Sequence, residues 1–149
     1  MKAKDIMTPD PACCTPDTPL REVAQAFIDH DCGAVPVVDD SKTRRPLGIV
    51  TDRDVACRAV AAGKNALEMT AREILSTPCV TVPLDASLDD VSRAMESNRV
   101  RRLLVVDSAG ACIGIIAQAD LALRGKEKKV GEVVKEISKP TRSASAVSH

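Results

Sequence analysis

The sequence predicts an α/β (α+β) fold built from two related units, each a small three-stranded sheet packed on two helices, followed by a C-terminal helix. The main observation is an internal repeat, because residues 4–40 align with residues 72–108 at a constant offset of 68 without a gap. Eight aligned pairs are identical, and residues 48–54 align with 114–120 after a loop two residues shorter. Helical and strand-like hydrophobic patterns also alternate within each unit. Two such units facing each other would form a pseudo-twofold cleft with two related pockets.

The first unit contains a helix and two strands that its hydrophobic pattern defines. Apolar residues recur at helical spacing over 20–28, which predicts an amphipathic helix. Pro19 opens this helix, where its missing N–H costs nothing, and Gly33 marks its end. The β-branched runs 34–39 and 46–51 flank a polar loop and predict two adjacent strands.

The second unit repeats this order. Ser87 and Asp90 form a capping-box pattern with Asp in place of the usual Glu, so we expect a helix to start there. The runs 102–107 and 112–117 predict the two strands. A linker near 63–70 joins the units.

These patterns predict four segments along the chain. The first repeat spans residues 3–63 and the second spans 71–125. Apolar residues at helical spacing predict an amphipathic helix over 126–139, whose apolar face must pack on the repeats or on a partner chain. The small, polar residues 140–149 predict a disordered tail.

Charge and composition argue against nucleic acid as the main partner. The chain carries 21 basic and 21 acidic residues, so no net field recruits a polyanion or an anionic membrane. Phe27 is the single aromatic residue, which leaves no platform for base stacking. The core must therefore be aliphatic.

The sequence also predicts a cytoplasmic protein without a disulfide scaffold. No apolar signal region or membrane-spanning run is apparent. The six cysteines show no C-x-x-C spacing, and most lie in apolar surroundings where a cysteine behaves as a small hydrophobe. A chain that can already bury a core does not need disulfides.

Residues Thr51 to Asp54 lie where a strand ends and a helix begins, and two interpretations have about equal weight. In the first, Thr51 is a helix N-cap and Asp54 completes the cap. In the second, the helix N-terminus and the Thr51 hydroxyl bind a phosphate, while Asp54 accepts both hydroxyls of a ribose. Each such charge-assisted bond contributes about 1.5–3 kcal/mol. The two roles are compatible.

Arginines 99, 101 and 102 precede the first strand of the second unit, whereas the first unit has no cation in the aligned stretch 31–34. A solvated surface role is the default for arginine. However, these side chains fall where the second unit would face the Thr51 end of the first, and guanidinium groups there would bind phosphates. The two pockets should therefore differ.

The ordered motifs resemble a tandem CBS-domain pair, the Bateman module. The resemblance rests on a Gly-apolar-apolar-Thr-x-x-Asp end on the first copy, its Ala-containing counterpart on the second, and a Val-Arg-Arg-Leu-x-Val-Val-Asp strand, and it covers residues 3–124. It implies a non-catalytic sensor, a homodimer without a tightly bound cofactor, that binds an adenosyl ligand reversibly and acts on an unknown protein target. The ligands it implies are AMP, ADP, ATP, NAD or S-adenosylmethionine.

The resemblance also implies two sites by position. In the first, Asp54 holds the ribose, Thr51 the phosphate, residues 79–80 enclose adenine and two arginines contact phosphates. Its residues are Ile49, Thr51, Arg53, Asp54, Cys79, Val80, Arg101 and Arg102. The second, weaker site comprises Ala12, Cys32, Gly33, Ala34, Ile115 and Asp120.

The second site departs from the family pattern. Ala117 replaces the Thr or Ser expected three residues before Asp120, which removes a phosphate donor. We expect this site to bind adenosine without tight phosphate contacts, or to be empty. Ala117 has no side chain that can cap the helix, yet Asp120 is still present. This is a modest argument that the aspartate has a function beyond the capping box.

Three other interpretations compete with the sensor. A metal or thiol sensor would use Cys13, Cys14, Cys32 and His30, although none of these has zinc-finger spacing. An enzyme is improbable because the chain has no nucleophile elbow, P-loop or paired catalytic carboxylates. The third is a structural dimerisation module with vestigial pockets.

Overall fold

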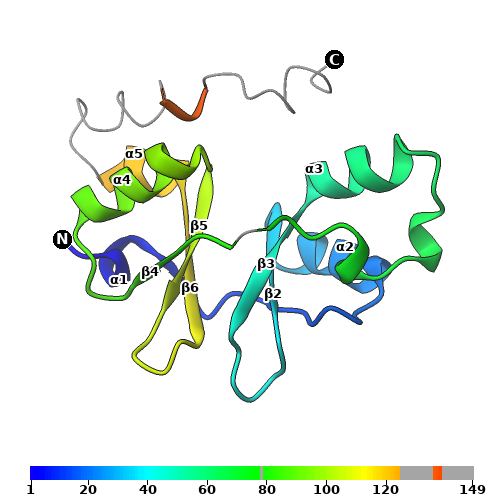
Figure 1. Ribbon diagram of the computed structural model, residues 1–149, viewed down its shortest axis with the longest axis horizontal. Coiled ribbons are helices and arrows are strands. Elements are labelled where there is room, and N and C mark those ends of the chain that lie inside the picture. Colours follow the sequence, from blue (N-terminus) through cyan, green and yellow to red (C-terminus); the bar gives the residue numbers. More distant parts are fainter. Residues whose placement is uncertain (78, 125–135, 139–149) are drawn as a thin grey trace.

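The two repeats form two lobes that stand side by side, with the sheets facing each other and the helices outside (Figure 1). The computed structural model describes residues 1–77, 79–124 and 136–138. The α/β class expected from the sequence is therefore present. Most of the predicted C-terminal helix and the whole tail 140–149 lie outside the described residues.

The first lobe is built on the antiparallel pair β2 (Ala34–Val38) and β3 (Pro46–Thr51). Helix α2 (Leu20–Asp29) covers this pair, and α3 (Asp52–Asp54) continues into a π-helical segment, η1 (Val55–Val60). All five residues of β2 are buried, because helices cover one face of the strand and the second lobe covers the other.

The second lobe holds a four-stranded sheet in the order β1-β6-β5-β4. Its own strands are β4 (Thr81–Pro83), β5 (Arg102–Val106) and β6 (Cys112–Ala117). Its helices are α4 (Leu88–Asn98) and α5 (Gln118–Arg124).

Each repeat gives its first residues to the other lobe. Helix α1 (Ala3–Ile6) packs in the core of the second lobe, and β1 (Thr8–Pro9) pairs with β6 (Figure 1). In the opposite direction, η3 (Ala71–Glu73) packs in the core of the first lobe, and Ser76 forms a single bridge with β3. The sheets accordingly have four and two strands, where three in each were expected. A further short helix, η2 (Ala66–Glu68), lies in the linker.

Two equivalent glycines make room for this exchange. A Cβ on Gly48 would lie 2.6 Å from the carbonyl oxygen of Ser76 and would also meet Leu75. A Cβ on Gly114 would collide with the side chain of Met7. Only a residue without a side chain lets the exchanged segment approach this closely.

The helix signals were confirmed in part. Ser87 and Asp90 form the expected reciprocal capping box at α4. Pro19 immediately precedes α2, but Gly33 does not end it, since the helix stops at Asp29 and the left-handed residue is Asp31, with φ +47°. The chain leaves the helix at an aspartate, which tolerates this conformation better than most residues.

Buried apolar residues form three clusters, one inside each lobe and one between the lobes. Each lobe has its own core, and Ile137, from the predicted C-terminal helix, is buried in that of the second. The third cluster, here called the seam cluster, joins the lobes. Its members are Cys13, Val38, Ile49, Cys79, Leu104, Cys112 and Ile115.

Candidate functional site

Thr51 and Asp54 form a complete capping box at the start of α3. The Thr51 hydroxyl oxygen accepts from the Asp54 backbone N–H at 3.1 Å, and Asp54 Oδ2 accepts from the Thr51 N–H at 2.9 Å. The local sequence dictates this geometry, because an N-cap hydroxyl and an N3 carboxylate satisfy two N–H groups that the helix cannot. The capping interpretation is confirmed.

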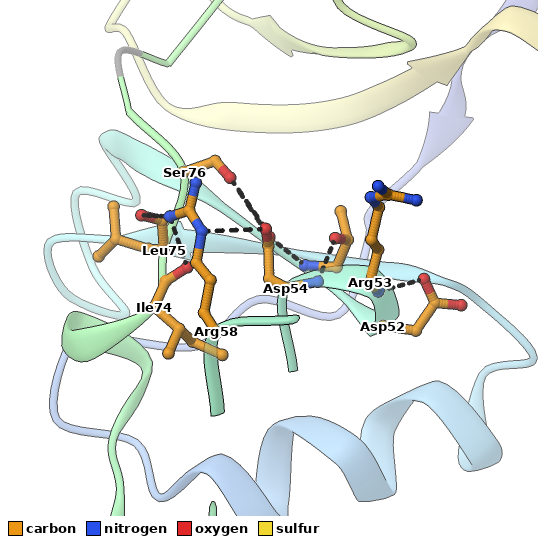
Figure 2. Close-up of polar contacts among 8 residues, drawn as sticks. Asp52, Arg53, Asp54, Arg58, Ile74, Leu75 and Ser76 are labelled. Atoms are coloured by element: carbon orange, nitrogen blue, oxygen red, sulfur yellow. Dashed lines mark hydrogen bonds and ion pairs between the residues drawn. The ribbon is translucent and has the colours of Figure 1, made fainter. Parts of the chain in front are cut away.

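The Asp54 carboxylate has further partners from outside its own helix turn. The Ser76 hydroxyl lies 3.3 Å from each carboxylate oxygen, and Arg58 Nε lies 3.7 Å from Oδ1. Figure 2 shows these groups converging on Asp54, whose residue exposure is only 9%. Arg58 also donates to the carbonyls of Ile74 and Leu75, both at 3.2 Å. The carboxylate is therefore occupied by the exchanged segment before any ligand arrives.

Arg102 reaches across from the second lobe to this end of the first. Its Nη2 lies 3.2 Å from where a Cβ on Gly33 would be, and Asp52 Oδ2 lies 3.1 Å from the same point. The Asp52 N–H in turn donates to the Gly33 carbonyl at 3.0 Å. A guanidinium from one repeat thus lies beside the first turn of α3 in the other. Gly33 allows this approach because it has no side chain.

The remaining residues of the first predicted site are spread over several environments. Ile49 and Cys79 meet in the seam cluster, whereas Val80 packs against the second-lobe core. Arg53 and Arg101 are exposed. In Figure 2 the Arg53 side chain extends away from Asp54.

The second predicted site contains a simpler cap. Asp120 Oδ2 accepts from the Ala117 N–H at 2.7 Å, the same contact that Asp54 makes to Thr51. Among the described residues Asp120 makes no other hydrogen bond or ion pair. Thr8 pairs with Ile115 as Ser76 pairs with Ile49, but the Thr8 hydroxyl makes no hydrogen bond to Asp120.

The other members of the second site also separate. Ile115 belongs to the seam cluster, while Cys32 packs against the first-lobe core. Ala34 is buried opposite Thr51 in the β2–β3 pair, next to Gly33. Ala12 is half-buried.

The sequence interpretation missed Ser76 and Arg58. A signal for Ser76 did exist, because the repeat offset aligns it with Thr8, so that both exchanged segments carry a hydroxyl at the same place. Arg58 lies four residues after Asp54, one helical turn further along, which is the usual spacing of an ion pair within a helix.

Two negative findings apply to the part of the chain that the structure describes. No three His, Cys, Asp or Glu side chains there lie close enough together to hold a metal ion. No helix there is long and apolar enough to cross a membrane.

The repeat, the exchanged segments and the paired strand ends can now be compared with known proteins. The family model described as CBS domain matches twice, at residues 3–59 and 71–126. The chain belongs to the CBS-domain family. Hypoxic response protein 1 of Mycobacterium tuberculosis is 34% identical over 143 residues, which cover 96% of this chain and 98% of that protein.

Solved CBS-pair structures share this architecture. Hypoxic Response Protein I with two coordinated zinc ions is 31% identical, with a TM-score of 0.74 over 85% of this chain and 100% of that one. The CBS domain pair of protein MJ0100, in complex with 5-methylthioadenosine and S-adenosylmethionine, is 27% identical. Its TM-score is 0.72 over 83% of this chain and 94% of that one.

Proposed function

We propose that this CBS pair is a non-catalytic sensor that binds an adenosyl ligand reversibly between its lobes and relays the bound state to a protein target. The ligand class is AMP, ADP, ATP, NAD or S-adenosylmethionine. The MJ0100 pair with its two adenosyl ligands supports this class. The proposal includes a homodimer.

The observation that carries the proposal is the meeting of groups from both repeats at the start of α3. The first repeat supplies the Thr51 hydroxyl and the Asp54 carboxylate, and the second supplies the Arg102 guanidinium beside Gly33. A carboxylate suits ribose hydroxyls and a guanidinium suits a phosphate. Ile49 and Cys79 offer apolar walls for an adenine.

Ligand binding at this site has to replace contacts that already exist. A ribose can bind Asp54 only if its hydroxyls substitute for Ser76 and, in part, for Arg58. Both partners touch or belong to the segment 74–76, which enters the first lobe from the start of the second repeat. When ribose hydroxyls replace these contacts, the segment 74–76 loses its attachment to Asp54. Ligand binding is therefore coupled to the position of the segment that joins the lobes.

In the second site, the proposal gives Asp120 the ribose and no phosphate contact. Its carboxylate retains acceptor capacity beyond the single bond to the Ala117 N–H. Ala117 has no hydroxyl for a phosphate, so adenosine and AMP should bind there about equally well.

The test is the shift in melting temperature with each adenosyl ligand and with adenosine, because a ligand that binds the native state raises stability by mass action. Asp54→Asn should abolish most of the AMP shift, and Arg102→Gln should reduce AMP binding towards that of adenosine. Asp90→Asn is the matched control, since Asp90 fills the same capping position in α4. Exposed Arg93→Gln controls for the loss of a guanidinium.

Two results would overturn the proposal. One is the absence of any shift with all six compounds in the wild-type protein. The other is an Asp54→Asn variant that keeps the full shift while remaining folded. A monomeric mass by light scattering at working concentration would overturn the homodimer but leave the ligand-binding proposal standing.

A further inference from the structure

Two cysteines from different repeats meet at the seam between the lobes. Cys112, the first residue of β6, is 1% exposed and belongs to the buried part of the seam cluster, against which Cys13 of the first repeat packs. The Cys112 thiol donates to the Gly114 carbonyl oxygen, with sulfur and oxygen 3.7 Å apart. Neither cysteine has a role in the adenosyl site proposed above, so this pair is independent of it.

Arg44 contacts both cysteines. Its Nη2 donates to Cys13 Sγ at 3.3 Å, and its backbone carbonyl accepts from the Cys112 N–H at 2.8 Å. Asp10 holds the guanidinium in place through an ion pair at 3.3 Å. Arg44 and Asp10 both adopt left-handed backbone conformations, with φ of +50° and +46°. Such conformations cost energy in residues other than glycine and collect at functional sites.

These neighbours lower the pKa of Cys13, whereas the pKa values of Cys14, Cys79 and Cys112 are raised. The hydrogen bond from Cys112 and then the Arg44 guanidinium lower the pKa of Cys13 to about 6, against the opposing effects of burial and of Asp10. Burial and the charge of Cys13 raise the pKa of Cys14 to about 12, and burial raises that of Cys79 to about 11. The pKa of Cys112 is raised, first by its interaction with the Cys13 sulfur and then by burial.

One contact competes with the charged form of Cys13. Its sulfur lies 3.3 Å from the Pro11 carbonyl oxygen, to which a neutral thiol would donate. The guanidinium lies at the same distance and carries a full charge, so it outweighs the partial charge of a carbonyl. In addition, Arg44 Nε is buried without a hydrogen-bond partner among the described residues. Oxygen added to the neighbouring sulfur would bring a new acceptor close to it.

We propose that Cys13, Cys112 and Arg44 form an oxidation-sensitive thiol site at which a hydroperoxide links the two repeats through a disulfide. The Cys13 thiolate attacks one peroxide oxygen, the O–O bond breaks, and the other oxygen leaves with a proton as water or an alcohol. Cys13 becomes a sulfenic acid. The Cys112 sulfur then attacks the Cys13 sulfur, the S–O bond breaks, and the hydroxyl leaves as water with the Cys112 proton. Two electrons pass from the thiols to the peroxide.

The position of this site gives the disulfide a structural consequence. The bond would fix the start of the first repeat to β6 of the second, within the cluster that also contains Ile49 and Ile115. Oxidation would therefore lock the two lobes in one relative position. A thiol reductant would release them.

The first experiment measures alkylation of the reduced full-length protein by iodoacetamide between pH 5 and 9, with each cysteine followed by peptide mass spectrometry. Fragmentation between Cys13 and Cys14 distinguishes the adjacent pair. We expect the Cys13 rate to level off above about pH 7, whereas the rate at Cys79, whose pKa is raised by burial, continues to rise. In Arg44→Gln the midpoint of the Cys13 alkylation profile should move to higher pH, because the cation that stabilises the thiolate is gone.

The second experiment treats the protein with one equivalent of hydrogen peroxide. We expect a Cys13–Cys112 linked peptide, lost in Cys112→Ser, where the hydroxyl can still donate to Cys13 and dimedone should trap the Cys13 sulfenic acid instead. Cys79→Ala is the matched control, because Cys79 also belongs to the seam cluster but has a raised pKa, and it should cross-link normally.

The proposal fails if peroxide oxidises another cysteine first, if the cross-link uses Cys14 or Cys79, or if Arg44→Gln leaves the alkylation profile of Cys13 unchanged. Cys112 is a core residue, so its variant could lose the fold. In that case Arg44→Gln, at a partly exposed side chain, decides the question without disturbing the core.

Discussion

Asp54 and Asp120 occupy equivalent places in the two repeats, yet their carboxylates are used very differently. Both accept the backbone N–H three residues earlier, at 2.9 and 2.7 Å. Asp54 is also contacted by Ser76 and Arg58, whereas Asp120 has no further partner among the described residues. The repeat therefore preserves the backbone cap in both lobes but not the surroundings of the carboxylate.

This difference changes how the two sites compare. Under the proposed function, the charge pattern favours phosphate binding at the first site, since Arg102 lies beside it and Thr51 has a hydroxyl. The contacts of Ser76 and Arg58 with Asp54 should lower ligand affinity at the first site, because a ligand must displace them. On the proposed function, we therefore expect the first site to prefer a phosphate and the second to offer the more available acceptor for a ribose.

The largest expected effect comes from the glycines that admit the exchanged segments. Gly48→Ala should lower the free energy of unfolding by about 3 kcal/mol, because the new methyl meets the Ser76 backbone, which cannot move alone. Gly114→Ala should cost about 1 kcal/mol, because it meets the flexible Met7 side chain. Urea unfolding followed by circular dichroism measures both, since the chain has no Trp. Equal costs would show that the two exchanged segments are equally rigid.

Exchanging the N-cap residues Thr51 and Ala117 should change the free energy of unfolding by a smaller amount. Thr51→Ala should cost about 1 kcal/mol, and Ala117→Thr should gain up to about 1 kcal/mol by completing the second box. Ser87→Ala, which breaks the same box in α4, should match the loss without altering ligand binding. An Ala117→Thr protein with unchanged stability would contradict the equivalence of the two lobes.

Removing the Ser76 hydroxyl, which competes with a ligand for the Asp54 carboxylate, should increase the difference in AMP affinity between the two sites. Ser76→Ala should tighten AMP binding to the first site about fivefold, since one hydrogen bond of about 1 kcal/mol no longer has to be replaced. Thr8→Ala, the equivalent change in the other repeat, should leave affinity unchanged. Titration calorimetry measures both. Unaltered affinity in Ser76→Ala would mean that the ligand does not use the Asp54 carboxylate.

The smallest effects should occur at two ion pairs, one exposed and one at the Asp54 carboxylate. Arg93→Gln should change stability by less than about 0.3 kcal/mol, because both partners are solvated. Arg58→Gln should cost about 1 kcal/mol, since Arg58 also donates to two carbonyls of the exchanged segment. Raising the salt concentration should reduce the first effect more than the second. Equal effects would indicate that the carbonyl contacts contribute nothing.

Features that depend on neighbours along the chain could be predicted from the sequence alone. The capping boxes at Thr51 and Ser87 involve residues three positions apart, and the strands follow from short β-branched runs. The repeat itself gave the two-lobed organisation and the CBS resemblance. The exit of α2 was misjudged at Gly33, because Asp31 takes the left-handed conformation without a glycine.

Features that join distant residues were decided by tertiary packing. Ser76 and Asp54 are separated by 22 positions and Arg44 and Cys13 by 31, so no local pattern could pair them. Periodicity tells which face of an element is apolar, but it does not tell which lobe that face will contact. The exchange of the first segments, and with it the environment of both aspartates and of Cys13, follows from burial of those apolar faces across the seam.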